Sequence, residues 1–407
     1  LIPLRSRVMP VSRRSFLTTM GAGSAGLVAA PLINWRGHEA LFGQQQQPVS
    51  PADRRADRLL ASRPGMIRID SNENPNGPGQ HVFDVITKHL GESNRYPTKT
   101  EIDLVDTIAK KQGVSAANVV LGCGSGELLR GAVFALTTSS AGLVAPEPTF
   151  EAPGAFAKFL NRPIVSPRVD SQLKLDLDAM VDAAKGAGLV YLCNPNNPTA
   201  TVHGKSDIAS YVERVNRASP DTTILIDEAY HEYVDDPSYA SAIPLAMDNP
   251  RVLVTRTFSK VFGMAGLRAG YAIARPETLA KIQPWLLGSN TNQLVLVAAA
   301  ATLVDSTHIA EEQRKNRAAR AFTRKFFEHA GYTVAATDAN FLMVDIRRDP
   351  KAFKTECITH DVAIGRAFPA LPTHARVSIG TMPEMKKAVA VFHTVLSAPP
   401  AATSQQR

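Results

Sequence analysis

The sequence predicts an α/β protein, with a largely parallel β-sheet covered by helices and a smaller C-terminal α+β domain. Two observations support this prediction. From about residue 66 onward, short apolar runs of strand length alternate with longer amphipathic runs of helix length. This alternation is typical of a parallel sheet that is covered on both faces. Beyond residue 300 the pattern changes to a long charged helix, short strand-like segments and a final helix.

The expected elements follow from this pattern in chain order. Buried strands are expected over residues 119–121, 142–145, 189–193, 223–226, 251–255 and 271–274. Helices are expected between them, over residues 101–112, 127–136, 152–159 and 207–218. The C-terminal part is expected to hold a helix over 309–330, strands over 333–335, 341–345 and 376–378, and a helix over 383–396.

Composition excludes several classes of protein. The 407 residues are 44% hydrophobic and 20% charged, which is typical of a globular protein with room for two domains and not of a disordered, collagen-like or coiled-coil chain. The three cysteines and the histidines lack the spacing of a disulfide framework or a metal site, so no metal is expected. Most of the net charge of +8 lies in residues 1–65, which hold nine arginines and three acidic residues, so nucleic acid is not an expected partner.

The N-terminal segment has the pattern of an export signal. Paired arginines at residues 13–14 precede a weakly apolar, glycine-rich run over residues 18–33, which is typical of a twin-arginine signal. A short membrane anchor or a buried helix is the alternative, although the run is short for a span. Its glycines match a dinucleotide-binding pattern, but no strand precedes them. We expect residues 1–47 to be a signal and a glutamine-rich linker, and the protein to be periplasmic or outside the cell, or cytoplasmic if the signal is not used.

Polar or glycine-rich turns follow the expected strands, and ligands of open α/β sheets bind beyond the carboxyl ends of strands. The turn at 122–127 is glycine-rich and precedes a helix, which suits an anion as well as a tight turn. Phe150 follows the next strand and could stack on a planar ligand or pack in the core. Asn197 lies between two X-Pro steps that hold the turn extended. Asp227 ends an apolar strand, where a carboxylate needs a cation, and Tyr230 lies three residues further on.

The fifth expected strand leads to a lysine. Lys260 lies in an apolar neighbourhood that can lower the pKa of an amine and make it a nucleophile. Arg268, together with Thr257 and Ser259, could hold a phosphate. Each residue alone could be structural or lie on the surface. Together they supply an amine nucleophile, a buried acid, a phosphate-binding turn, a stacking ring and an amide, a set that suits pyridoxal 5'-phosphate (PLP). Lys260 would form a Schiff base with PLP, and Asp227 would keep its pyridine nitrogen protonated.

Residues 68–396 resemble a fold-type I, class I/II PLP-dependent aminotransferase, nearest the histidinol-phosphate aminotransferase group. The segments that carry the resemblance lie at residues 70–78 (Asp-Ser-Asn-Glu-Asn-Pro-Asn-Gly-Pro), 95–97 (Arg-Tyr-Pro), 122–127, 194–199, 227–230, 257–268 and 376–381 (Arg-Val-Ser-Ile-Gly-Thr). The resemblance implies an N-terminal arm over 48–80, a large PLP-binding domain over 81–290 with a mostly parallel seven-stranded sheet, a small domain over 291–400 and a disordered tail over 401–407.

The resemblance also implies a role for each matching residue. Lys260, Asp227 and Tyr230 would be catalytic: Lys260 carries the aldimine and moves the proton, and Asp227 pairs with the pyridinium nitrogen. Tyr230 and Asn197 would hydrogen-bond the ring oxygen of PLP. The phosphate would be bound by Ser125, Gly126, Thr257, Ser259 and Arg268, and Phe150 would stack on the ring. Tyr96 would reach the phosphate in the neighbouring subunit, which implies a homodimer with shared active sites.

Substrate contacts are implied for Arg376, which would bind the α-carboxylate, and for Asn197 and Asn76. The family often has Tyr where this chain has Asn76 and Phe150, and Gly where it has Ala200. Because Asn76 lies on the arm that shapes the substrate pocket, we expect a substrate other than histidinol phosphate. Arg366 could recognise a distal acidic group or lie on the surface.

The expected function is transfer of an amino group between an amino acid and a 2-oxo acid, both small molecules. The alternative enzyme is a PLP-dependent lyase or decarboxylase acting on an amino acid, which the motifs barely separate from a transaminase. Lys260 and Asp227 disfavour a non-catalytic binding protein, and the lack of a dinucleotide fingerprint in a suitable context disfavours a dehydrogenase. No stable membrane span is expected in the mature chain.

Overall fold

The computed structural model describes residues 63–398. The predicted signal and linker over 1–47, the first part of the predicted arm and the predicted tail over 401–407 lie outside these residues.

A seven-stranded sheet forms the centre of the large domain. Its strands follow the spatial order β2-β8-β7-β6-β5-β3-β4. They are β2 (Val119–Gly122), β3 (Leu143–Val144), β4 (Ile164–Val165), β5 (Leu189–Cys193), β6 (Thr223–Asp227), β7 (Val252–Thr257) and β8 (Gly270–Ile273). β8 runs antiparallel to both of its neighbours, and the other pairs are parallel. The predicted mostly parallel, seven-stranded sheet of an α/β fold is thus confirmed.

Helices cover both faces of this sheet because its central strands are apolar on both sides. Every residue of β5, β6 and β7 is buried. One face packs against a cluster built with α5 (Ser125–Leu136), α6 (Ala152–Phe159) and α10 (Pro276–Ile282). The other face packs against helices that include α4 (Thr98–Gln112) and α8 (Lys205–Ala218). The remaining helices on this face are α3 (Gln80–His89), α7 (Leu177–Ala183), α9 (Ile243–Asp248) and α11 (Gln293–Val304).

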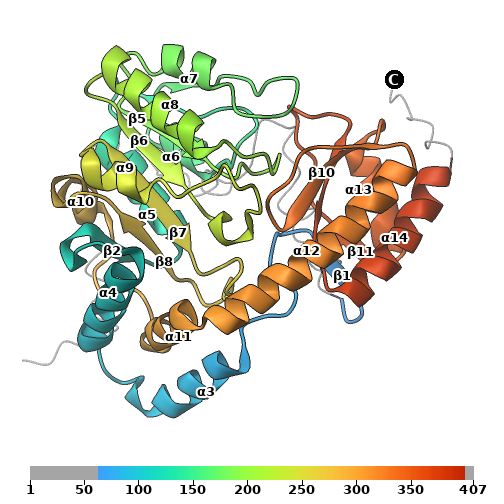
Figure 1. Cartoon of the computed structure of the whole chain (residues 1–407), viewed down its shortest axis with the longest axis horizontal. Helices are drawn as coiled ribbons and strands as arrows, with labels where there is room; N and C mark the ends of the chain where they lie inside the picture. The colour runs from blue at the N-terminus through green and yellow to red at the C-terminus, as the bar shows by residue number, and fades with distance from the viewer. Residues whose placement is uncertain (1–62, 399–407) are drawn as a thin grey trace, which may run out of the picture. The chain divides into compact units, whose positions relative to one another are not determined.

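The C-terminal part has a separate apolar core. Its antiparallel sheet has the order β12-β10-β9, formed by β9 (Thr333–Val334), β10 (Phe341–Asp345) and β12 (His374–Ser378). β11 (Val362–Ile364) pairs in parallel with β1 (Ile67–Ile69), so a strand from the predicted arm joins this part. The helices here are α12 (Ser306–His329), α13 (Pro350–Thr359) and α14 (Met382–Ser397) (Figure 1).

Two helices meet near the predicted boundary between the domains. α11 follows that boundary in sequence, yet it packs against α3 and α4 and adds Val295, Leu296 and Leu303 to the core beside the large sheet. α12 continues from α11 after a bend of 79° and packs against β9, β10 and α14. Among residues 63–398, no single helix has the length and apolar composition of a membrane span, and only this bent pair meets that test jointly.

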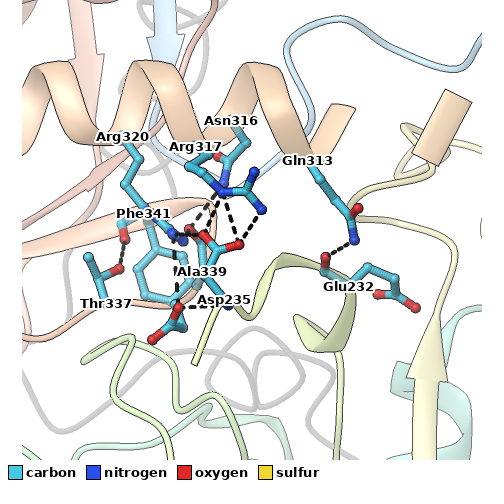
Figure 2. A network of polar contacts seen from close by, with 10 residues as sticks. Glu232, Asp235, Gln313, Asn316, Arg317, Arg320, Thr337, Ala339 and Phe341 are labelled. Carbon is cyan, nitrogen blue, oxygen red and sulfur yellow. Dashed lines mark hydrogen bonds and ion pairs between the residues drawn. The ribbon is translucent and has the colours of Figure 1, made fainter. Parts of the chain in front are cut away.

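A network of charged groups attaches α12 to two loops (Figure 2). Arg320 donates hydrogen bonds to the carbonyl of Ala339 (2.9 Å) and to the carboxylate of Asp235 (2.6 Å). Arg317, one turn earlier, pairs with the same carboxylate, and the backbone N–H of Asp235 donates to Asp338 (2.9 Å). The hydrogen bond from Arg317, with the charge of Arg320, holds the pKa of Asp235 below its usual value. The network therefore joins the loop after Tyr233 to the loop before β10.

We expect the two arginines of this network to differ in their contribution to stability. The side chain of Arg320 is 9% exposed, whereas that of Arg317 is 56% exposed. Arg320→Met removes the buried ion pair with Asp235 and the shorter of the two hydrogen bonds to the Ala339 carbonyl, which keeps only the bond from Asn316 at 3.4 Å. The free energy of unfolding should therefore fall by about 2–3 kcal/mol. Arg317→Gln removes a solvent-screened pair and should cost less than about 1 kcal/mol. Urea denaturation of the two variants measures the difference, and equal losses would contradict it.

Candidate active site

The polar residues predicted at strand ends come together at one edge of the large sheet. Asp227 is the last residue of β6, and Thr257 is the last residue of the neighbouring β7. Ser125 begins α5, and its backbone lies so close to Gly270 that a Cβ atom at residue 270 would be 2.5 Å from the Ser125 nitrogen. Glycine at the start of β8 therefore lets the N-terminus of α5 approach the end of β7.

Asp227 is a carboxylate inside the protein. Its side chain is buried, and both oxygens accept hydrogen bonds: Oδ2 from the hydroxyl of Tyr191 (2.9 Å) and Oδ1 from the hydroxyl of Thr255 (3.1 Å). Burial raises the pKa of Asp227 to about 6, and the two hydroxyl groups oppose this shift. A carboxylate in such a place is suited to pair with a protonated ring nitrogen, because the pair lies away from water.

Lys260 follows β7 and points toward the segment that precedes α3. Its Nζ donates a hydrogen bond to the carbonyl of Asn72 (3.1 Å) and lies 5.4 Å from the centre of the Tyr230 ring. Burial, and after it the charge of Arg376, lowers the pKa of Lys260 to about 8. About one amine in ten is then neutral at pH 7, and the neutral amine is the form that can attack an aldehyde.

The lowered pKa predicts how Lys260 reacts with an aldehyde. Only the neutral amine attacks, so capture of PLP by the apoprotein should rise about tenfold per pH unit below pH 8 and level off above it. Borohydride trapping, followed by mass spectrometry of the peptide that contains Lys260, measures this capture. Labelling that still rises steeply above pH 9 would contradict the lowered pKa.

A cradle that suits an anion lies between α5 and the loop after β7. Arg268, which has a φ of 67°, donates to the hydroxyl of Ser259 (3.4 Å), and the hydroxyl of Thr257 accepts from the N–H of Ser259 (3.1 Å). Gly124 has a φ of 74°, a conformation that favours glycine, and a Cβ there would lie 2.2 Å from the Arg268 guanidinium. A Cβ at Gly126, on the first turn of α5, would meet no atom within 4 Å. The open N-terminus of the helix and the guanidinium together suit a phosphate.

Asn72 is a central residue of the site that the sequence analysis did not select. It is buried with a φ of 55°, a left-handed conformation that asparagine tolerates better than most residues. Its Nδ2 donates to the Tyr230 hydroxyl (3.2 Å), and its Oδ1 accepts from Ser378 (2.7 Å). Its carbonyl accepts from Lys260 and from Asn340 (3.0 Å). Burial raises the pKa of Tyr230 above its usual value, so its hydroxyl stays protonated.

Arg376 lies on β12 and reaches the large domain. It donates to the Asn197 side chain (2.8 Å) and to the Asp70 carbonyl (2.8 Å). Its Nε is buried, yet no residue in the described part of the chain accepts a hydrogen bond from it. A substrate carboxylate is the type of group that would satisfy such a donor.

The other predicted site residues lie away from Lys260, Asp227 and Arg376 or at the margin of the site. Tyr96 is 87% exposed on the loop before α4. Asn76 donates to Glu312 of α12 (2.7 Å), and Phe150 is half-buried against the cluster under α5. Arg366 pairs with Glu151, and its guanidinium lies over the Phe368 ring, 4.1 Å from the ring centre. Burial and the charge of Arg376 lower the pKa of Arg366 to about 10.

Within residues 63–398, no group of three or more histidine, cysteine, aspartate or glutamate side chains is placed to hold a metal ion. The donor set fits PLP instead. Arg268, Ser259 and the start of α5 would hold its phosphate, Asp227 would face its ring nitrogen, and Lys260 would meet its aldehyde.

Comparison with known proteins identifies the family. The model of aminotransferase class I and II matches residues 64–392. The chain is 31% identical over 334 residues to a histidinol-phosphate aminotransferase from Symbiobacterium thermophilum, covering 81% of this chain and 91% of the relative. It is 31% identical over 335 residues to histidinol-phosphate aminotransferase 1 from Nitrosococcus oceani, covering 82% and 89%. The fold superposes with a TM-score of 0.79, at 24% identity, on the histidinol-phosphate aminotransferase from Sinorhizobium meliloti solved with PLP, covering 87% of this chain and 98% of that one.

The chain therefore belongs to the class I and II aminotransferase family. It is a PLP-dependent aminotransferase of fold type I, as the sequence predicted. When bound, PLP accepts electrons from the substrate carbon whose proton is removed.

Proposed function

We propose that this aminotransferase transfers the amino group of an α-amino acid to a 2-oxo acid, and that its physiological substrate is not histidinol phosphate. The observation that carries the proposal is the buried Nε of Arg376, which has no hydrogen-bond acceptor among residues 63–398. The same side chain donates to Asn197, and its charge contributes to the lowered pKa of Lys260. In this arrangement Arg376 and Asn197 orient the α-carboxylate, and Lys260 removes and returns the α-proton. Tyr230, whose hydroxyl accepts a hydrogen bond from Asn72, would hold the ring oxygen of PLP.

The proposed substrate difference rests on the arm. Asn76, where the family resemblance implies a tyrosine, donates a hydrogen bond to Glu312 and so lies against α12. The guanidinium groups of Arg366 and Arg376 both approach the Phe368 ring, at 4.1 Å and 5.4 Å from its centre. Because Arg366 is paired with Glu151, a substrate with a second acidic group would bind there by taking the place of the Glu151 carboxylate.

A half-reaction tests this function. Single amino acids are added to the PLP-loaded protein without an oxo acid, while the absorption of the bound cofactor and the products are recorded. We expect conversion by acidic amino acids, formation of the matching 2-oxo acid, and recovery when a 2-oxo acid is added. Release of carbon dioxide or ammonia without an acceptor would instead establish the lyase or decarboxylase, and turnover of histidinol phosphate alone would overturn the substrate proposal.

We also propose that the enzyme is a homodimer with shared sites, in which the exposed Tyr96 of each subunit reaches the phosphate in the other. Two inactive variants test this proposal. If Tyr96→Ala and Lys260→Ala chains are unfolded and refolded together, hybrid dimers should regain activity, since one of their two sites is intact. If the mixture stays inactive, Tyr96 acts within its own subunit.

Export by the twin-arginine route, to the periplasm or the cell exterior, is proposed from the paired Arg13 and Arg14 before an apolar run. This route carries folded proteins, so PLP can be bound before export. Cell fractionation should find the protein outside the cytoplasm and find the Arg13→Lys/Arg14→Lys variant retained inside. The same distribution of the parent protein and the variant between the cell fractions would contradict the proposal.

A further inference from the structure

The neighbourhood of Asp227 is set by strand pairing. In the parallel register Cys193 of β5 lies opposite Asp227, and Thr255 of β7 lies opposite it on the other side. Side chains two residues apart in a strand share a face, so Tyr191 is on the same face as Cys193. The carboxylate at the end of β6 thus has a hydroxyl-bearing residue on each neighbouring strand.

Both hydroxyl groups bond to the carboxylate, and each takes a different oxygen. Tyr191 donates to Oδ2 at 2.9 Å, and Thr255 donates to Oδ1 at 3.1 Å. Tyr191 and Thr255 are each 0% exposed and Asp227 is 2% exposed, so water does not compete for these contacts. With one oxygen fixed from each side, the carboxylate cannot rotate about its Cβ–Cγ bond without breaking both hydrogen bonds.

The two hydroxyl groups also counteract the cost of burying a charge. A carboxylate without partners in an apolar place would take up a proton, because burial disfavours its charged form. Hydrogen bonds from Tyr191 and Thr255 shift the pKa of Asp227 back toward its usual value. Burial raises the pKa of Tyr191 well above its usual value, so its hydroxyl keeps the proton that it donates.

We propose that Tyr191 and Thr255 are positioning residues of the transamination site, which keep the Asp227 carboxylate ionised and oriented toward the ring nitrogen of PLP. The inference rests on the proposed role of Asp227 as the partner of that nitrogen. The two residues act through Asp227 and need not touch the cofactor. A carboxylate oxygen has two lone pairs, so a hydroxyl on one of them leaves the other for the ring N–H.

PLP affinity of the apoprotein tests the inference, because it is measured without turnover. Tyr191→Phe removes only a hydroxyl that bonds a charged group, so the dissociation constant for PLP should rise about tenfold or more. Thr255→Val should weaken binding severalfold, and Thr255→Ser, which keeps the hydroxyl, should restore affinity to within twofold. The matched control is Tyr211→Phe: Tyr211 is also buried, but its hydroxyl has no hydrogen-bond partner in the described part of the chain, and affinity should not change.

A double-mutant cycle shows whether Tyr191 acts through Asp227. In the Asp227→Ala background, Tyr191→Phe should change PLP affinity less than twofold. Asp227→Asn provides a second background if the alanine variant does not fold. Two results would overturn this inference and leave the proposed role of Asp227 intact. One is that Tyr191→Phe weakens PLP binding as much in both Asp227 backgrounds as in the parent protein. The other is that PLP affinity is unchanged in Tyr191→Phe and Thr255→Val. If Asp227→Ala itself binds PLP as tightly as the parent protein, the proposed role of Asp227 fails as well.

Discussion

Replacement of Lys260 by alanine should reduce transamination by about four orders of magnitude or more. The variant loses the amine that is placed both to attack an aldehyde and to move the substrate proton, and each role alone contributes on the order of a hundred- to ten-thousandfold. Arg268, Ser259 and Asp227 do not depend on Lys260 for their contacts with one another or with their neighbouring strands. The variant should therefore still bind PLP.

The measurement is the single-turnover rate with the best amino donor, together with PLP retention after dialysis. Lys281→Ala, at an exposed lysine of α10, serves as the control and should retain the parent rate. Partial recovery of Lys260→Ala by added small amines would show that a missing base causes the loss. Activity within tenfold of the parent would rule out Lys260 as the nucleophile.

Arg376→Lys should raise KM for the amino donor about a hundredfold while kcat changes much less. Lysine keeps the charge but lacks the planar fork, so it cannot bind a carboxylate through two parallel hydrogen bonds and also reach Asn197 and the Asp70 carbonyl. Because these hydrogen bonds stabilise the bound substrate and the transition state equally, their loss raises KM and leaves kcat nearly unchanged. PLP affinity should stay within threefold of the parent, because the cradle at Arg268 is unchanged.

An amino acid amide provides the control for Arg376, because it lacks the carboxylate that this residue binds. The parent and Arg376→Lys should use such an amide with similar and low efficiency, and the difference between them should appear only with the acid. A KM that is unchanged for the acid, or raised equally for the amide, would show that Arg376 does not bind the α-carboxylate.

The strands of the large sheet could be predicted where apolar runs have clear limits. β5 was predicted with its observed bounds because Gly188 precedes the run and Asn194 follows it. β6 and β7 extend further than predicted, to Asp227 and Thr257, because ladder pairing continues past the last apolar residue. β4 and β1 are two and three residues long and give no recognisable pattern. α11 lacks a polar face, because it is buried between α3, α4 and the large sheet, so its sequence has no helical periodicity.

The residues of the candidate site also fall into two groups. Some can be recognised from the neighbouring sequence, and others only from contacts with residues far along the chain. Residues at or after the end of a strand, such as Asp227 and Lys260, could be found because a polar group after an apolar run is visible in the sequence. Asn72 could not be selected, because its partners Lys260 and Ser378 lie 188 and 306 residues away. Tyr191 falls inside the expected buried strand over residues 189–193, and only the register with β6 reveals that its hydroxyl meets Asp227.

The ribosome makes the partners of Asn72 much later than Asn72 itself, so the parts of the site are synthesised at different times. The cradle around Ser125, Ser259 and Arg268 is complete once the first two thirds of the chain have been synthesised. Asn72 is made earlier still, but its partners Asn340 and Ser378, and the neighbouring Arg376, come among the last residues to leave the ribosome. A chain terminated before Asn340 would thus carry Lys260 and the cradle but lack Arg376, which is proposed to bind the substrate α-carboxylate together with Asn197. Under that proposal, cofactor chemistry is paired with substrate binding only once the C-terminal part has been made.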